Sequence, residues 1–284
     1  MQAILGYLSY IPFGYEMKLG LAIASERALP SAFVVFRDKL SKSIRKVAQL
    51  GYDGVELALL DSSQVSLPEI KALLKEYRLE LPVISTGQVF ADAKLWLTHS
   101  DAAIRQRTIQ RLKSLIDLAS EFGAMVNIGR VRGPLDLQDP KASEERFVEG
   151  IRKCGEYGCS RGVKIILEPV NRYEINFINS VLDGVEILKK IDNGQIFLMP
   201  DVFHMNIEDA SIDGSLKAAK DVIAYVHFAD SNRWAPGDGH LDFPGIINTL
   251  NEIGYAGFVT LEILPYPDPD TAASRGIQYL RKFI

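Results

Sequence analysis

Eight short apolar runs alternate with longer amphipathic segments along this chain, and this alternation restricts its fold more than any other feature. The runs have four to seven residues and are rich in β-branched side chains, which is typical of parallel strands buried on both faces. Repeated units of strand and helix predict an α/β fold with a parallel sheet. The predicted strands are Lys18–Ala24, Gly54–Ala58, Pro82–Thr86, Met125–Gly129, Lys164–Glu168, Ile196–Asp201, Tyr225–Phe228 and Phe258–Ile263.

The segments between the runs carry helix signals. An apolar stripe over residues 40–48 has helical spacing and ends at Gly51. The run Ser66-Leu67-Pro68-Glu69 predicts a capping box with proline in the first turn of the next helix. Ser180 is predicted to cap a further helix over residues 181–191.

The number and order of these units predict a single (β/α)8 barrel, a TIM barrel, over residues 18–284. Residues 1–17 precede the first predicted strand, and we expect them to form an N-terminal extension. A doubly wound open sheet is the alternative, but no G-x-G-x-x-G run follows the first strand. Hydrophobic residues make up 47% of the chain and charged residues 24%, which excludes an intrinsically disordered protein.

Charge and cysteine usage restrict the partners of the chain. Its net charge of −4 lacks the basic excess of a nucleic-acid-binding protein. No apolar run approaches the ~18 residues of a membrane span, so we expect no membrane partner. Cys154 and Cys159 match neither a metal spacing nor a redox spacing, and the reducing cytoplasm is the expected location.

Four consecutive predicted strands end in acidic or imidazole side chains. Glu168 and Asp201 end the fifth and sixth runs, and His227 and Glu262 are the last residues but one of the seventh and eighth. In a (β/α)8 barrel these ends meet at one mouth, where carboxylates at close range resist ionising together. A divalent cation would hold them, and this donor set suits Mn²⁺, Mg²⁺ or Co²⁺ better than structural Zn²⁺. Glu56 lies in the second run, where a structural and a supporting role stay open.

The sequence around these residues resembles the sugar-phosphate isomerase/epimerase superfamily, whose members have xylose-isomerase-like barrels. Within it, the chain is most similar to ketose epimerases of the D-tagatose 3-epimerase and psicose 3-epimerase type. The resemblance runs from about the second strand to the C-terminus. It is carried by Glu262 and by the runs Leu-Glu-Pro-Val-Asn-Arg-Tyr-Glu from residue 167, Pro-Asp-Val-Phe-His-Met-Asn from residue 200 and His-Phe-Ala-Asp-Ser-Asn-Arg from residue 227.

The resemblance implies a role for each matching position. The implied metal ligands are Glu168, Asp201, His227 and Glu262, with Mn²⁺ favoured over Co²⁺ or Mg²⁺. Glu168 and Glu262 are also the implied acid/base residues. The implied substrate-binding residues are His204, Arg233 and Glu174, the last of which supports the site from the loop after the fifth strand. Barrels of this group commonly self-associate, so the resemblance also implies a homo-oligomer.

The expected reaction is epimerisation of a keto sugar at the carbon next to the ketone. One glutamate removes the proton on that carbon, and the other returns a proton on the opposite face of a cis-enediolate. An aldose–ketose isomerase or an inosose-type dehydratase would share the same intermediate. A DNA repair enzyme related to endonuclease IV needs additional histidines, whereas this chain has four. A non-catalytic sugar-binding protein would not need both glutamates.

Two arginines after the fourth predicted strand bear on the charge of the substrate. Arg130 and Arg132 are expected at the catalytic mouth, where a neutral ketose needs no permanent cation. Arginine binds carboxylates in a bidentate geometry, so we expect a keto sugar acid, such as a hexulosonate or a keto-uronate, as the substrate. The structural alternative is that one or both arginines pair with acidic residues in nearby loops, such as Asp136 or Asp139.

Overall fold

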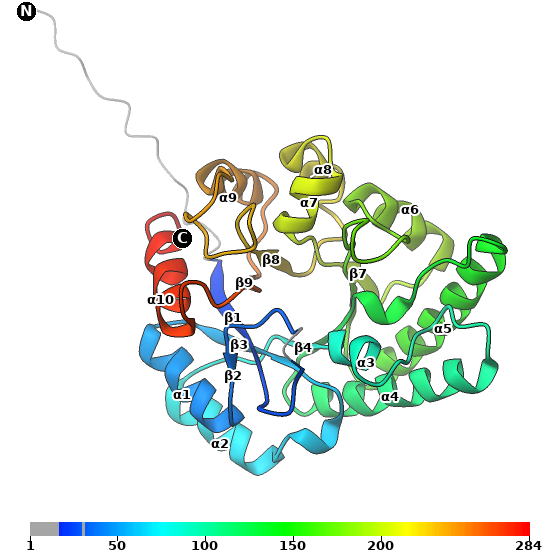
Figure 1. The fold of residues 1–284 in the computed structure, drawn as a ribbon, viewed down its shortest axis with the longest axis horizontal. Helices are drawn as coiled ribbons and strands as arrows, with labels where there is room; N and C mark the ends of the chain where they lie inside the picture. Colours follow the sequence, from blue (N-terminus) through cyan, green and yellow to red (C-terminus); the bar gives the residue numbers. More distant parts are fainter. Residues whose placement is uncertain (1–16, 30–31) are drawn as a thin grey trace, which may run out of the picture.

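The computed structural model describes residues 17–29 and 32–284 and contains the predicted ring of parallel strands (Figure 1). Seven parallel pairings connect eight strands in the order β7-β6-β5-β4-β3-β1-β9-β8. Single bridges, Leu198 to Ile223 and Asp201 to His227, join the two ends of this ladder. The eight strands are β1 (Lys18–Ala24), β3 (Gly54–Ala58), β4 (Val83–Ser85), β5 (Met125–Ile128), β6 (Ile165–Leu167), β7 (Ile196–Leu198), β8 (Val226–Phe228) and β9 (Phe258–Leu261).

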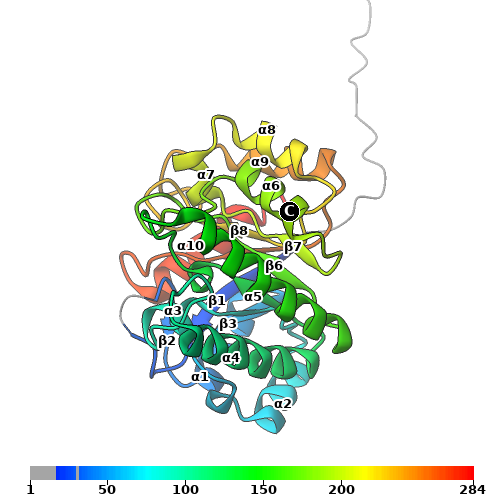
Figure 2. The same cartoon turned by 90° about the vertical axis from the view of Figure 1, so that its right-hand side faces the viewer.

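Helices surround these strands, as Figures 1 and 2 show from two directions. Their apolar faces are buried in one core cluster together with side chains of the strands. Two short 3₁₀ helices, η1 (Ser62–Gln64) and η2 (Arg130–Arg132), follow β3 and β5. The α-helices are α1 (Leu40–Leu50), α2 (Leu67–Tyr77), α3 (Gly87–Ala91), α4 (Ala102–Ser120), α5 (Pro140–Ser160), α6 (Val181–Ile191), α7 (Val202–Glu208), α8 (Ile212–Ala218), α9 (Phe243–Glu252) and α10 (Pro269–Leu280). The predicted α/β fold and TIM barrel are confirmed.

The helix signals are confirmed with one exception. α1 ends where predicted, with Gly51 in the left-handed region at φ 87°, and Ser180 forms a complete capping box at the start of α6. α2 also begins after Ser66, but the Ser66 side chain makes no capping hydrogen bond, so the predicted capping box is wrong. Pro68 in the first turn needs no hydrogen-bond partner for its nitrogen, which makes the side-chain cap less necessary.

Several strands end earlier than predicted, and one strand was not expected. β7 ends at Leu198 and β9 at Leu261, so Asp201 and Glu262 follow their strands instead of ending them. The regular hydrogen-bonded pairing of these two strands therefore stops before Asp201 and Glu262. The two-residue strand β2 (Phe36–Arg37) pairs with the end of β1 outside the ring and is too short to show alternation in the sequence.

Three further predictions concern the N-terminal segment, the cysteines and membrane spans. Of the predicted extension over residues 1–17, only Met17 lies within the described residues, and its side chain is buried; residues 1–16 lie outside them. Cys154 and Cys159 are free cysteines on α5. Across residues 17–29 and 32–284, no helix combines the length and the hydropathy needed to cross a membrane.

Candidate metal centre and active site

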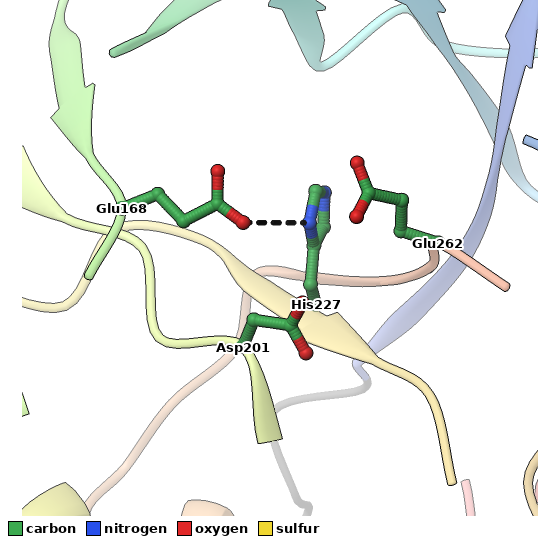
Figure 3. Close-up of side chains that lie close together, drawn as sticks. All are labelled: Glu168, Asp201, His227 and Glu262. Carbon is green, nitrogen blue, oxygen red and sulfur yellow. Dashed lines mark ion pairs between the residues drawn. The ribbon is translucent and has the colours of Figure 1, made fainter. Parts of the chain in front are cut away.

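Four side chains from four adjacent strands meet at the mouth of the barrel. Glu168 directly follows β6, Asp201 is the N-cap of α7 after β7, His227 lies in β8, and Glu262 directly follows β9. One potential ligand atom from each lies within 4.8 Å of the others. Glu168 and Glu262 extend toward each other beside His227 (Figure 3). The structure thus brings together all four predicted ligands.

Two atoms of this cluster are buried without a hydrogen-bond partner: Asp201 Oδ2 and His227 Nδ1. The charged groups beside them are too distant for a hydrogen bond, since Asp201 Oδ2 is 3.6 Å from His204 Nε2 and His227 Nδ1 is 3.8 Å from Glu168 Oε1. A buried polar atom without a partner costs about 1–3 kcal/mol. Both atoms face the space that the four side chains share, so the donor set fits a divalent cation.

The charges of the cluster favour the same conclusion. Burial raises the pKa of Asp201 to about 8 and the pKa of Glu262 to about 7, although the positive charges of Arg233 and His227 oppose both shifts. Burial also acts to raise the pKa of Glu168, but His227, His204 and Asn127 together outweigh burial and hold that pKa at about 2. Without a cation, these carboxyls therefore do not all ionise at neutral pH.

Glu56 supports His227 from the interior of the barrel. Its Oε2 accepts a hydrogen bond of 2.8 Å from His227 Nε2, and both residues are fully buried. A carboxylate on one ring nitrogen orients the imidazole so that the other nitrogen can bind a metal. Burial lowers the pKa of His227, but Glu56 and Glu168 together raise it well above its usual value, so a metal at Nδ1 would displace a proton from the metal-free protein. Because the contact occupies Nε2, it is Nδ1 that faces Glu168. Of the two roles left open for Glu56, this contact indicates the supporting one, since Glu56 orients a proposed metal ligand.

His204 lies in α7 beside the ligand cluster and is 2% exposed. Asn171 Nδ2 lies 2.8 Å from His204 Nδ1 and is the donor of that contact, because an amide nitrogen cannot accept. His204 Nε2 then carries the hydrogen and lies 3.6 Å from Asp201 Oδ2. Burial and the charge of Arg233 hold the pKa of His204 well below its usual value, so the ring is a neutral donor.

Two asparagines near the cluster did not stand out in the sequence. Asn171 orients His204, and Asn127, 3% exposed near the end of β5, donates from Nδ2 to Glu168 Oε2 over 3.1 Å. Asn171 belongs to the run from residue 167 that carries the family resemblance, so a signal for it was present. Asn127 ends its strand without a charge, and only the tertiary contact identifies it.

Arg233 connects the cluster to Glu174. Its Nη1 donates to Glu174 Oε1 and its Nη2 to Glu262 Oε2, each over 2.7 Å. The Arg233 backbone lies in the left-handed region at φ 62°, which is uncommon for a residue other than glycine. Asp230 holds this loop in place, because its carboxylate accepts from the backbone nitrogens of Ser231, Gly237 and Leu241.

Arg132 does not lie where the sequence prediction expected it. It is fully buried and donates hydrogen bonds of 2.8–3.0 Å to the backbone carbonyls of Gly129, Glu168, Phe177 and Ile178. These bonds use four of its five N–H groups, so its predicted role in binding a substrate carboxylate is not supported. The Asp136 and Asp139 side chains accept from the backbone nitrogens of Gln138 and Ala142 instead of pairing with Arg132. The alternative of an acidic partner in a nearby loop applies to Arg130, which pairs with Glu174.

Arg130 does lie at the mouth. Its side chain is 21% exposed, and Nη1 is 3.5 Å from Glu174 Oε2, a loose ion pair. Together with Glu262, Phe33, Gln88 and Asp92, it lines a small cavity of about 40 Å³ between the β1–β2 segment and α3. Of the two predicted guanidiniums, only Arg130 lies where it could contact a substrate.

Comparison with known proteins identifies the family. The xylose isomerase-like TIM barrel family matches residues 44–283. An L-ribulose 3-epimerase of Methylomonas sp. (strain DH-1) is 33% identical over 78% of this chain and 77% of its own length. A 3-dehydro-D-guloside 4-epimerase of Escherichia coli (strain K12) is 26% identical over 87% and 95%. The crystal structure of D-psicose 3-epimerase with D-tagatose from Clostridium cellulolyticum H10 has a TM-score of 0.81 at 26% identity and covers 94% of this chain and 99% of that one. As its sequence predicted, the chain belongs to the xylose isomerase-like TIM barrel family, and it is an enzyme of the isomerase class.

Proposed function

We propose that this protein is a divalent-metal-dependent epimerase that inverts the carbon next to the ketone of a keto sugar. The observation that carries the proposal is the approach of Glu168 and Glu262 to one space from different strands, beside Asp201 and His227. The names of its relatives support the same reaction type, since they are a 3-epimerase of ketoses and a 4-epimerase of a 3-dehydro sugar. In the 3-dehydro sugar, too, the inverted carbon is next to the ketone.

The ligands would be Glu168, Asp201, His227 and Glu262, and Mn²⁺ is the metal that we favour. Bound there, the cation would act as a Lewis acid on the ketone oxygen and its neighbouring hydroxyl. His204 Nε2–H and Arg233 would donate hydrogen bonds to the oxygen on which negative charge develops. Because His204 is neutral and Asn171 accounts for its other nitrogen, it would donate without giving up its proton.

The two glutamates would divide the proton transfers. Glu168 or Glu262 would take the proton from the carbon next to the ketone, and the other would supply one to the opposite face. Asn127 donates to Glu168 and Arg233 donates to Glu262, so each carboxylate is oriented by its own partner. Which glutamate acts first follows from the configuration of the substrate.

A keto sugar acid remains our preferred substrate class, now on the evidence of Arg130 alone. Its guanidinium lines the cavity beside Glu262 and is held only loosely by Glu174. A substrate carboxylate could accept hydrogen bonds from the Arg130 guanidinium. This contact would stabilise the bound substrate by about 1.5–3 kcal/mol, which is a preference of about 10- to 150-fold over a neutral ketose. Comparing kcat/KM for a ketohexose and for its carboxylate-bearing analogue, with wild type and Arg130→Ala, tests this. Preference for the neutral ketose in both proteins would contradict it.

Proton NMR in D₂O with Mn²⁺, across a panel of ketoses and keto sugar acids, tests the proposal as a whole. Deuterium should enter the true substrate at one carbon next to the ketone, together with formation of the epimer. An aldose product would instead identify an aldose–ketose isomerase, and loss of a hydroxyl would identify a dehydratase. Binding without exchange would identify a sugar-binding protein.

Two further proposals concern the protein in its cell. We propose a homo-oligomer because of the family resemblance, and a cytoplasmic location because of the two free cysteines. Light scattering during size-exclusion chromatography tests the first, and a mass of about one chain, 31.6 kDa, would contradict it. Fractionation of the native cells tests the second.

A further inference from the structure

Two phenylalanine rings pack against the guanidinium of Arg233. Phe33 lies between β1 and β2, and Phe203 lies in the first turn of α7. The Arg233 Cζ is 3.6 Å from the centroid of the Phe33 ring and 4.8 Å from that of Phe203. Arg130 Cζ lies 5.5 Å from the same Phe33 ring. Phe33 thus contacts both cations at the mouth of the barrel.

The hydrogen bonds of Arg233 leave its orientation dependent on these rings. Each terminal nitrogen donates to one carboxylate, Nη1 to Glu174 and Nη2 to Glu262, while Nε is buried without a partner. A guanidinium held only at its terminal nitrogens can tilt about the line that joins them. Ring faces packed on the group oppose this tilt, and their attraction for a cation is strongest where water is excluded. Arg233 is 5% exposed, so that condition is met.

We propose that Phe33 and Phe203, which we call the aromatic clamp, are positioning residues that hold Arg233 on Glu262. The inference deepens the proposed function and rests on it, because Glu262 is the proposed acid/base residue at the other end of the contact. Loss of the clamp would let the guanidinium tilt, which would turn the Nη2–H bond away from the Glu262 oxygen and misalign the carboxylate before proton transfer. The effect would fall mainly on kcat, since a proton transfer depends steeply on geometry.

Phe33 is the better residue to vary. Phe203 is covalently next to His204, and their rings lie 5.3 Å apart, so its replacement would also disturb His204. Phe33 is half-buried in a segment outside the barrel ring, where a substitution leaves the core intact. A matched control is Phe122, a half-buried ring under Lys71 at 5.9 Å, in the α4–β5 turn at the opposite end of the barrel.

The test compares Phe33→Leu, Phe33→Tyr and Phe122→Leu, measured on the keto sugar that wild type turns over. Phe33→Leu should lower kcat roughly tenfold and change KM less, while Phe33→Tyr should stay within about threefold of wild type because it keeps the ring. Phe122→Leu should behave as wild type. In an Arg233→Gln background, Phe33→Leu should cause little further loss. Equal kcat values for Phe33→Leu and Phe33→Tyr, or fully additive losses, would overturn the proposal.

A second measurement needs no substrate. Phenylglyoxal modifies accessible arginines, and mass spectrometry of peptides gives the rate at Arg233 in each variant, with buried Arg132 as the internal reference. Modification of Arg233 should be faster in Phe33→Leu than in wild type or Phe33→Tyr, and equal rates would contradict the clamp. If wild type turns over no keto sugar, the proposed function fails, and this rate still tests the contact.

Discussion

At the scale of single residues, the site depends on which atoms are satisfied by the protein. Asp201 Oδ2 and His227 Nδ1 have no partner, whereas Glu168 and Glu262 each receive a hydrogen bond from a neighbouring side chain. The unpartnered atoms therefore suit metal ligation, and the supported glutamates, which would also be ligands, are in addition oriented for proton transfer. Substitutions at Asp201 or His227 should therefore affect metal binding, and substitutions at Glu168 or Glu262 should also affect proton transfer.

Replacing either glutamate by glutamine should lower epimerisation by about 10²- to 10⁴-fold, because an amide cannot take up the proton. Steady-state rates of Glu168→Gln and Glu262→Gln, each with metal content measured by elemental analysis, check this expectation. Asn248→Ala, which changes a surface contact on α9, is a suitable control. A variant with its metal bound and a near-wild-type rate would show that the altered glutamate is not an acid/base residue.

Metal binding should release protons near neutral pH. The pKa values of Asp201, about 8, and Glu262, about 7, are raised by burial above those of free carboxyls. At pH 7 in the metal-free protein, Asp201 is therefore mostly protonated and Glu262 about half protonated. A cation must displace those protons, and its affinity should therefore rise as the pH increases toward 8. Calorimetric titration with Mn²⁺ at pH 7, in buffers of different ionisation enthalpy, measures the protons released. A heat independent of the buffer would contradict the expectation.

At the scale of elements, Arg132 joins three segments that carry the site. From η2 it binds carbonyls at the end of β5, at the end of β6 and in the segment before α6. One of these carbonyls belongs to Glu168 itself, so the guanidinium fixes the backbone of a proposed ligand. The sequence prediction gave this cation to the substrate, but the backbone uses it instead.

Arg132→Met should therefore lower the free energy of unfolding by about 3 kcal/mol or more, because it leaves buried carbonyls without donors. Arg130→Met should cost no more than about 1 kcal/mol, since Arg130 makes one loose, partly exposed ion pair. Urea denaturation of the two variants makes the comparison. Equal losses of stability would mean that Arg132 does not have the structural role described here.

At the scale of the whole molecule, the barrel has one weakly paired junction. β7 and β8 share no ladder, and the two bridges that join them are Leu198 to Ile223 and Asp201 to His227. Two of the four proposed metal ligands, Asp201 and His227, thus form the bridge at this junction. A cation bound by both would cross-link the strands at the junction that has isolated bridges in place of a continuous ladder.

Metal removal should consequently abolish activity and loosen this junction first. The amide of His227, which donates to the Pro200 carbonyl over 2.9 Å, should exchange with D₂O faster after chelation. The amide of Val55, which donates to Glu80 in another part of the ring, should change little. Mn²⁺ or Co²⁺ should restore both activity and protection. Full turnover by a protein shown to be metal-free, or uniform exchange around the ring, would contradict this prediction.

The sequence by itself determined the barrel and its four-residue cluster. Eight buried strands leave a regular apolar pattern, and side chains that directly follow parallel strands meet at one edge regardless of loop detail. Glu168, Asp201, His227 and Glu262 could therefore be named together before any coordinates. These are properties of local pattern and strand order, which the sequence specifies directly.

Only the tertiary structure decided which groups each arginine and His227 contact. Arg130 and Arg132 are two residues apart, yet one lines the cavity and the other is enclosed by backbone carbonyls. Phe33 reaches Arg233 across 200 residues of sequence, and Glu56 reaches His227 across 171. Side-chain contacts of this kind depend on how loops pack after the ring forms. No local pattern encodes that packing, because the same residues could satisfy their hydrogen bonds in many other arrangements.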